Sequence, residues 1–312
     1  MAANQGHVMM LPWLAFGHML PFFKFSKILA AKGVYVSFIC IPKNIQRLPP
    51  IPQELADRMR FVELALPAVD GLPDNIEATT DLQFEQLQYL RKASDELYVP
   101  IEKIILTRKP DLIMFHFVHC WIPAIATNIF SAATLAFLGP LSELISPSLR
   151  TRPEDFAVAP SWIHFPSLVA YRFDEANRIC HYFSFRDVSG LSFGERFGKT
   201  LEGCEFVAVR SCREFESEYL NLLEELYDKP VLSVGLLPPT LPDNGNHSLI
   251  DSKWSSTFDW LDRQKPKSVV FVGFGTEYKM PIKEIHELAS ALKASKLPGP
   301  RKQKQRAQTS YL

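Results

Sequence analysis

The sequence predicts an α/β protein built on a parallel sheet, followed by the start of a second α/β domain. Two apolar runs and the segment between them support this fold class. His7–Phe16 is a continuous apolar run, which is typical of a strand buried on both faces. Val34–Ile41 is β-branched and apolar, and Pro42 ends it. A short helical segment between two buried strands implies parallel strands joined by a right-handed crossover.

The first helix is expected directly after Gly17 and His18, which interrupt the apolar run. Pro21 stands where a helix can begin, because the first helical turn needs no proline N–H. Apolar residues recur at helical spacing across Phe22–Leu29, and Gly33 is placed to end the helix.

The same alternation of elements continues along the chain. Further strands are expected at Arg60–Leu64, Asp111–Phe117, Thr134–Leu138, Phe206–Arg210, Val231–Val234 and Ser268–Gly273. Further helices are expected at Gln83–Leu106, Trp121–Phe130, Glu214–Leu226, Ser255–Asp262 and Pro281–Ala294. Residues 145–200 are rich in proline and aromatic residues and show no regular pattern.

We expect a first domain over residues 1–235 and a linker over residues 236–266. The linker begins with a segment rich in Pro, Gly and Asn. Residues 267–298 form an incomplete second domain, because one strand and one helix cannot cover both faces of a sheet or satisfy its edges. Residues 299–312 are basic and lack apolar periodicity, so we expect a disordered tail.

Composition excludes several classes of protein. The 34 basic and 34 acidic residues balance, whereas nucleic-acid binding requires a basic excess. The five cysteines are scattered without a C-x-x-C pair, so we expect no disulfide framework, no zinc site and a reducing, cytoplasmic location. No apolar run reaches the roughly 18–20 residues of a membrane span, and the residues before Val8 lack the basic charge of a signal peptide.

Three short motifs are candidates for chemistry. His18 follows a buried strand, where open α/β sheets bind ligands, and an imidazole there can act as a general base or simply as a capping or core residue. In the segment GFGT, Gly275 permits close approach of a ligand and Thr276 can bind phosphate, although a plain glycine turn fits equally well. Ser192 lies in a G-x-S-x-G pattern, the nucleophile elbow of serine hydrolases, but the buried strand that should precede it is missing.

His116 and His119 form a pair of histidines that resembles part of a metal site. Residues three apart on a strand face opposite sides of the sheet, so joint ligation is not expected, and we predict no metal.

Several segments together resemble the plant UDP-sugar-dependent glycosyltransferases of family 1. They are His7–Gly33, Arg152–Pro160, Phe206–Glu216, Lys229–Pro239 and Ser268–Glu277. The motifs RSC-x-EFE and GFG[ST]E are most similar to those of the branch that adds rhamnose or glucose to flavonoid or terpenoid glycosides. The resemblance covers residues 6–297.

This resemblance implies a GT-B fold, in which two Rossmann-like domains face each other. The first domain, residues 1–235, would bind a small-molecule acceptor, and the second would bind the UDP-sugar donor. The implied reaction is inverting transfer to a hydroxyl by a monomer, with the UDP-sugar as co-substrate and without a cofactor. Gly275 and Thr276 then become donor-binding candidates.

The resemblance also gives His18 the role of general base toward the acceptor hydroxyl. The family places an orienting aspartate on the strand that corresponds to Asp111–Phe117, and alignment of this strand puts His116 at that position. Asp111 cannot replace the aspartate, because five residues of strand place it roughly 16 Å away.

The family's donor signature, which begins W-x-P-Q and continues through H-C-G-W-N-S, is absent after Thr276. We therefore expect a C-terminally truncated or mis-spliced product with impaired activity. The alternatives are a non-catalytic acceptor-binding remnant, a gene-model fragment and, remotely, a serine hydrolase using Ser192.

We predict that residues 1–312 bind UDP-glucose and UDP-rhamnose more weakly than about 10 µM. One or two hydrogen bonds from Thr276 and its neighbours contribute roughly 0.5–1.5 kcal/mol each, whereas a 1 µM site requires about 8 kcal/mol. Isothermal titration measures this directly, and tighter binding would contradict the prediction.

Overall fold

The computed structural model describes residues 6–121, 125–128, 130–238, 252–274 and 280–295. The chain divides into two compact units, residues 1–237 and residues 238–312. No helix among these described residues combines the length and apolarity that a membrane span requires.

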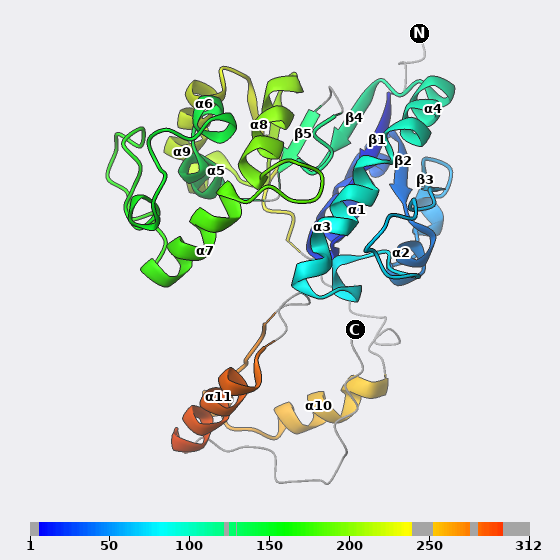
Figure 1. The fold of residues 1–312 in the computed structure, drawn as a ribbon. Coiled ribbons are helices and arrows are strands. Elements are labelled where there is room, and N and C mark those ends of the chain that lie inside the picture. Colours follow the sequence, from blue (N-terminus) through cyan, green and yellow to red (C-terminus); the bar gives the residue numbers. More distant parts are fainter. Residues whose placement is uncertain (1–5, 122–124, 129, 239–251, 275–279, 296–312) are drawn as a thin grey trace. The chain divides into compact units, whose positions relative to one another are not determined.

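The first unit contains a sheet of seven strands in the order β3-β2-β1-β4-β5-β6-β7 (Figure 1). Every neighbouring pair is parallel, which confirms the predicted parallel sheet. The strands are β1 His7–Leu11, β2 Tyr35–Cys40, β3 Met59–Glu63, β4 Leu112–Phe115, β5 Ile125–Asn128, β6 Val207–Val209 and β7 Val231–Ser233.

Helices alternate with these strands. In the first unit they are α1 Phe16–Ala31, α2 Pro42–Arg47, α3 Leu87–Asp95, α4 Tyr98–Arg108, α5 Ala132–Leu138, α6 Leu141–Ile145, α7 Phe173–Ser184, α8 Phe193–Gly203 and α9 Arg213–Tyr227. The second unit contains α10 Ser252–Asp262 and α11 Ile282–Ala294.

Both faces of the sheet are buried, as the continuous apolar runs predict. Along β1, Met9 and Leu11 belong to one hydrophobic cluster, while Val8 and Met10 belong to another that includes α1. Successive side chains of a strand point to opposite faces, so β1 lies between two cores.

The helix α1 begins earlier than the sequence predicts. Its first turn closes where Ala15 O accepts from the backbone N–H groups of His18 and Met19, so Pro21 lies inside the helix and not at its start. The missing proline N–H leaves one intrahelical bond, to Gly17 O, unmade. His18 is therefore a residue of the first helical turn.

Two neighbouring elements are interchanged relative to the prediction. The segment expected as the helix Trp121–Phe130 contains strand β5, and the expected strand Thr134–Leu138 is helix α5. Short apolar runs fit a strand or a helix equally well. Here residues 125–128 form a strand because they pair between β4 and β6. Ser131 caps α5 by accepting from Thr134 N.

Three other predictions differ from the structure. The expected helix Gln83–Leu106 is divided between α3 and α4, and residues 145–200, which show no pattern, contain α7 and most of α8. Residues 268–273 are not a strand. A strand requires a hydrogen-bonded neighbour, and the described residues of the second unit contain no other strand.

A buried carboxylate links α5 to α9. Glu216 accepts from the backbone N–H groups of Ala132 and Ala133 and from the hydroxyl of Ser211. The first N–H groups of a helix have no intrahelical partner, so this carboxylate satisfies two of them and lies at the positive end of the α5 dipole.

We predict that Glu216→Ala lowers the free energy of unfolding by about 2–4 kcal/mol, because buried donors lose a charged acceptor. Urea denaturation measures the loss. Glu218→Ala, on an exposed position of the same helix, is the matched control and should change stability by less than about 0.5 kcal/mol. Equal effects of the two substitutions would contradict this role for Glu216.

Candidate functional site

The strand order places a crevice at the carboxyl ends of β1 and β4. From β1 the chain builds β2 and β3 on one side, and it then returns to add β4 on the other side. Ligands of open α/β sheets bind where the order reverses in this way. Leu11 and Phe115 are register partners, so the residues that follow them leave the sheet together.

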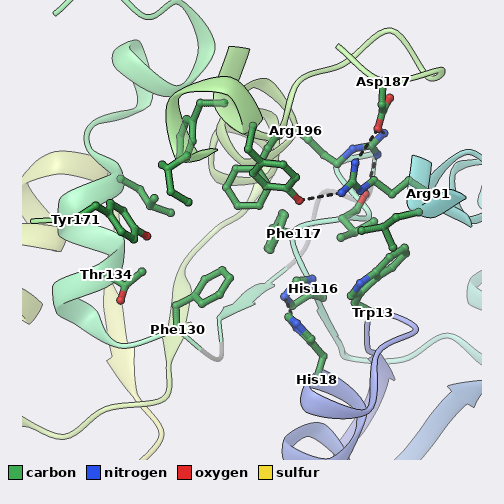
Figure 2. Close-up of a pocket in the computed structure, with 17 residues that line it drawn as sticks. Trp13, His18, Arg91, His116, Phe117, Phe130, Thr134, Tyr171, Asp187 and Arg196 are labelled. Atoms are coloured by element: carbon green, nitrogen blue, oxygen red, sulfur yellow. Dashed lines mark hydrogen bonds and ion pairs between the residues drawn. The ribbon is translucent and has the colours of Figure 1, made fainter. Parts of the chain in front are cut away.

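His18 and His116 meet at this crevice (Figure 2). His18 Nδ1 lies 2.7 Å from His116 Nε2, and the two rings are perpendicular. His116 directly follows β4, and its backbone N–H donates to Leu11 O, which extends the ladder between the two strands. The approach of His116 to His18 that strand alignment predicts is therefore present. Asp111 accepts from His7 N at the opposite end of β1, as its spacing requires.

Burial keeps the histidine pair uncharged. It lowers the pKa of His18 to about 4. His116 is fully buried, and its pKa is lowered by burial first and then by the neighbouring His18 and His119. A proton on either ring loses its hydration without gaining a carboxylate, so both rings are neutral at pH 7.

One ring nitrogen of this pair lacks a partner. His116 Nδ1 is buried and has no hydrogen-bond partner among the described residues. Because each neutral ring carries one proton, the bond between the rings has two possible directions, and each leaves Nδ1 of His116 unsatisfied.

His18 lines a cavity of about 280 Å³. Its wall is mainly aromatic, with contributions from Trp13, Phe117, Phe130, Tyr171, Tyr182, Phe183 and Phe193. Its polar lining comes from His18, His116, Thr134, Arg91, Asp187 and Arg196. A largely apolar cavity with few polar groups is suited to a flat small molecule whose orientation those groups fix.

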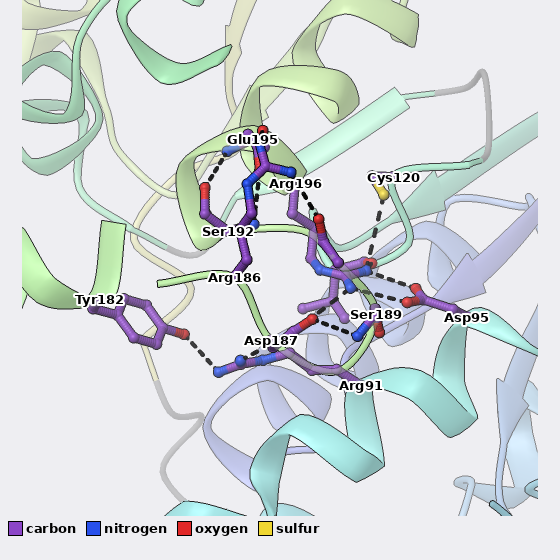
Figure 3. A network of polar contacts seen from close by, with 12 residues as sticks. Arg91, Asp95, Cys120, Tyr182, Arg186, Asp187, Ser189, Ser192, Glu195 and Arg196 are labelled. Atoms are coloured by element: carbon purple, nitrogen blue, oxygen red, sulfur yellow. Dashed lines mark hydrogen bonds and ion pairs between the residues drawn. The ribbon is translucent and has the colours of Figure 1, made fainter. Parts of the chain in front are cut away.

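A largely buried network of ion pairs supports one wall of the cavity (Figure 3). Arg196, on α8, is 2% exposed and binds both oxygens of Asp95 on α3, at 2.6 and 2.9 Å. Asp187 lies 3.9 Å from Arg196 and 3.4 Å from Arg91. Arg91 also donates to the Tyr182 hydroxyl at 2.8 Å. The sequence offers no signal for this network, because its members come from segments far apart in the chain.

The other predicted residues have different surroundings. Ser192 is the N-cap of α8, and its hydroxyl accepts from Glu195 N while the Glu195 carboxylate accepts from Ser192 N. Gly275 and Thr276 lie outside the described residues. His119 contacts Ser94 and Pro12 O, and no group of metal-ligating side chains occurs in the described part of the chain.

Comparison with known proteins reveals relatives in plants. The chain is 41% identical over 301 residues to UDP-glycosyltransferase 91C1 of Arabidopsis thaliana, covering 94% of this chain and 64% of that protein. It is 38% identical over 306 residues to UDP-glycosyltransferase 91D1 of Stevia rebaudiana, covering 95% and 61%. It is 33% identical over 311 residues to soyasaponin III rhamnosyltransferase of Glycine max, covering 94% and 63%. The chain thus spans under two thirds of the length of these relatives.

Solved structures agree on the fold. Arabidopsis thaliana UGT89C1 complexed with UDP-L-rhamnose superposes with a TM-score of 0.63 at 18% identity, over 95% of this chain and 64% of that one. Medicago truncatula UGT71G1 complexed with UDP-glucose gives 0.61 at 18% identity, over 94% and 65%. The predicted GT-B class is confirmed for the part of the fold that the chain covers. No family model matches the chain.

We predict that the His18 ring titrates with a midpoint near pH 4 in proton NMR spectra, with His18→Gln used to assign its resonance. Between the ordinary value of 6.5 and this midpoint, the unfolded chain binds a proton that the folded chain does not, so acidification through this window destabilises the fold. A midpoint near 6.5 would show that burial does not control this ring.

Proposed function

Because the chain is related in sequence to the plant UDP-glycosyltransferases, we propose that it forms the acceptor half of such an enzyme. The proposed reaction transfers glucose or rhamnose from a UDP-sugar to a hydroxyl of a small-molecule glycoside such as a flavonoid or triterpenoid. The observation that carries this proposal is the position of His18, at the carboxyl end of β1 and against an aromatic cavity. An acceptor hydroxyl bound in that cavity lies within the reach of an imidazole.

In this proposal His18 is the general base. Its Nε2 takes the proton of the acceptor hydroxyl while that oxygen attacks the anomeric carbon of the donor sugar and UDP leaves from the opposite face. An alcohol is a weak nucleophile at neutral pH, so a positioned base is required. UDP-sugar is the co-substrate, and Gly275 and Thr276 remain the proposed donor contacts. The proposed working form is a monomer.

The histidine pair sets the efficiency of this base. His18 Nε2 can accept a proton only if the ring already carries its own proton on Nδ1 and donates it to His116 Nε2. His116 must then carry its proton on Nδ1, a buried donor without a partner among the described residues. An unsatisfied buried polar atom costs about 1–3 kcal/mol, but the opposite direction of the bond leaves the same nitrogen unsatisfied, so the pair does not favour the base-competent form as a carboxylate would.

Domain complementation tests the function. Residues 1–312 would be fused to the C-terminal third of a full-length relative and incubated with UDP-glucose or UDP-rhamnose and a flavonol glucoside. Mass spectrometry should detect a product one hexose or one deoxyhexose heavier, and His18→Ala should abolish it. A folded fusion that carries His116→Asp and transfers no sugar, or a fusion that transfers it equally without His18, would refute the proposal and favour a non-catalytic acceptor-binding protein.

We predict that His116→Asp and His116→Glu accelerate the fused enzyme. A carboxylate only accepts hydrogen bonds, so it fixes the proton of His18 on Nδ1, and it also stabilises the imidazolium that forms. The rate should rise at least about tenfold, and loss of such a carboxylate costs on the order of 10⁴ in related constellations.

The glutamate variant is included because an aspartate side chain is shorter than that of histidine and could fail to reach His18. His116→Gln is the neutral control. Circular dichroism verifies that each variant is folded. If the two carboxylates and the glutamine give the same rate as His116, the orienting role does not apply to this chain.

A further inference from the structure

Away from His18, two polar side chains of the cavity keep hydrogen-bond donors that have no acceptor among the described residues. Arg91 contributes from α3 and Tyr182 from α7, and both line the cavity; Figure 3 shows the two side chains in contact. The Arg91 side chain is 14% exposed, so most of its surface is removed from bulk water.

Arg91 retains donors without partners. One terminal nitrogen donates to Asp187 at 3.4 Å and the other to the Tyr182 hydroxyl at 2.8 Å. A guanidinium has five N–H hydrogens, and within the described residues these two contacts are the only ones the side chain makes through a hydrogen bond. Buried donors are normally satisfied by protein, water or ligand.

Tyr182 adds one more donor. Its oxygen accepts from Arg91, so its own hydrogen must point to another acceptor, and none occurs in the described part of the structure. Burial raises the pKa of Tyr182, although the nearby Arg91 opposes this, and the phenol keeps its proton at pH 7.

The neighbouring carboxylates are engaged with other donors (Figure 3). Asp187 accepts from Ser189 N through Oδ1, and its Oδ2 faces Arg91 and Arg196. Both oxygens of Asp95 are bound by Arg196. The donors at this side of the cavity that lack a partner among the described residues therefore belong to Arg91 and Tyr182, and those of Arg91 are cationic.

We propose that Arg91 and Tyr182 form a subsite for a carboxylate carried by the molecule that occupies the cavity. A carboxylate offers only acceptors, and a guanidinium edge matches its geometry. Hydrogen bonds to a charged group are about twice as strong as neutral ones, so the subsite favours an acid over its amide. This deepens the proposed function by naming an acidic acceptor, and it depends on that function only in calling the bound molecule an acceptor.

The test is binding of 4-hydroxycinnamate and of its uncharged primary amide to residues 1–312 at pH 7, without donor. The acid should bind at least about tenfold more tightly than the amide. Tyr182→Phe retains the ring and removes one hydroxyl. It should weaken binding of the acid by about tenfold and change the affinity for the amide by less than about threefold. Arg91→Met should abolish the preference, and Arg91→Lys should restore part of it.

Arg178→Met is the matched control, because Arg178 is an exposed arginine of α7 that pairs only with Asp174 in the described residues. It should leave the preference for the acid intact. Equal binding of acid and amide by the unaltered chain would overturn the subsite, as would equal weakening of both by Tyr182→Phe. Because no sugar is transferred in this experiment, its failure is distinguishable from failure of the proposed reaction.

Discussion

The pairing of β1 with β4 is the constraint on which the site depends. Two segments about a hundred residues apart in the chain are brought into register, with Leu11 beside Phe115. His116 leaves β4 one residue later, and its N–H remains bonded to Leu11 O. The backbone ladder therefore fixes the position of His116, and α1, which begins after β1, brings His18 to it. A slip of one residue in this register would turn His116 to the other face of the sheet.

Part of this arrangement follows from the sequence, and part does not. The long apolar runs of β1 and β2 predict a parallel sheet, and alignment of the expected strand Asp111–Phe117 with the pattern of the similar family places His116 beside His18. The interchange of β5 and α5 does not follow from the sequence. Segments of four to seven residues fit a strand or a helix, and only their position in the sheet determines which one forms.

The network around Arg196 cannot be predicted from local sequence patterns, for another reason. Asp95 and Asp187 carry no periodic signal that distinguishes them from surface residues, and the segment that contains Asp187 has no clear pattern of its own. Their pairing with Arg196 joins α3 and the segment between α7 and α8 to α8, which is a tertiary property. An arginine in the middle of an amphipathic helix would normally be assigned to solvent.

The two sides of the cavity are consequently held by different forces. On the sheet side, a backbone ladder positions a neutral histidine pair, and replacement of side chains there leaves the ladder in place. On the helical side, buried ion pairs position Arg91 and Tyr182, and removal of one partner of such a pair leaves an uncompensated charge at a cost of about 3–5 kcal/mol. Proton transfer and recognition of the bound molecule are thus separable in this fold. Changes on the helical wall can alter which molecule is bound, whereas the geometry of His18 and His116 depends on the sheet.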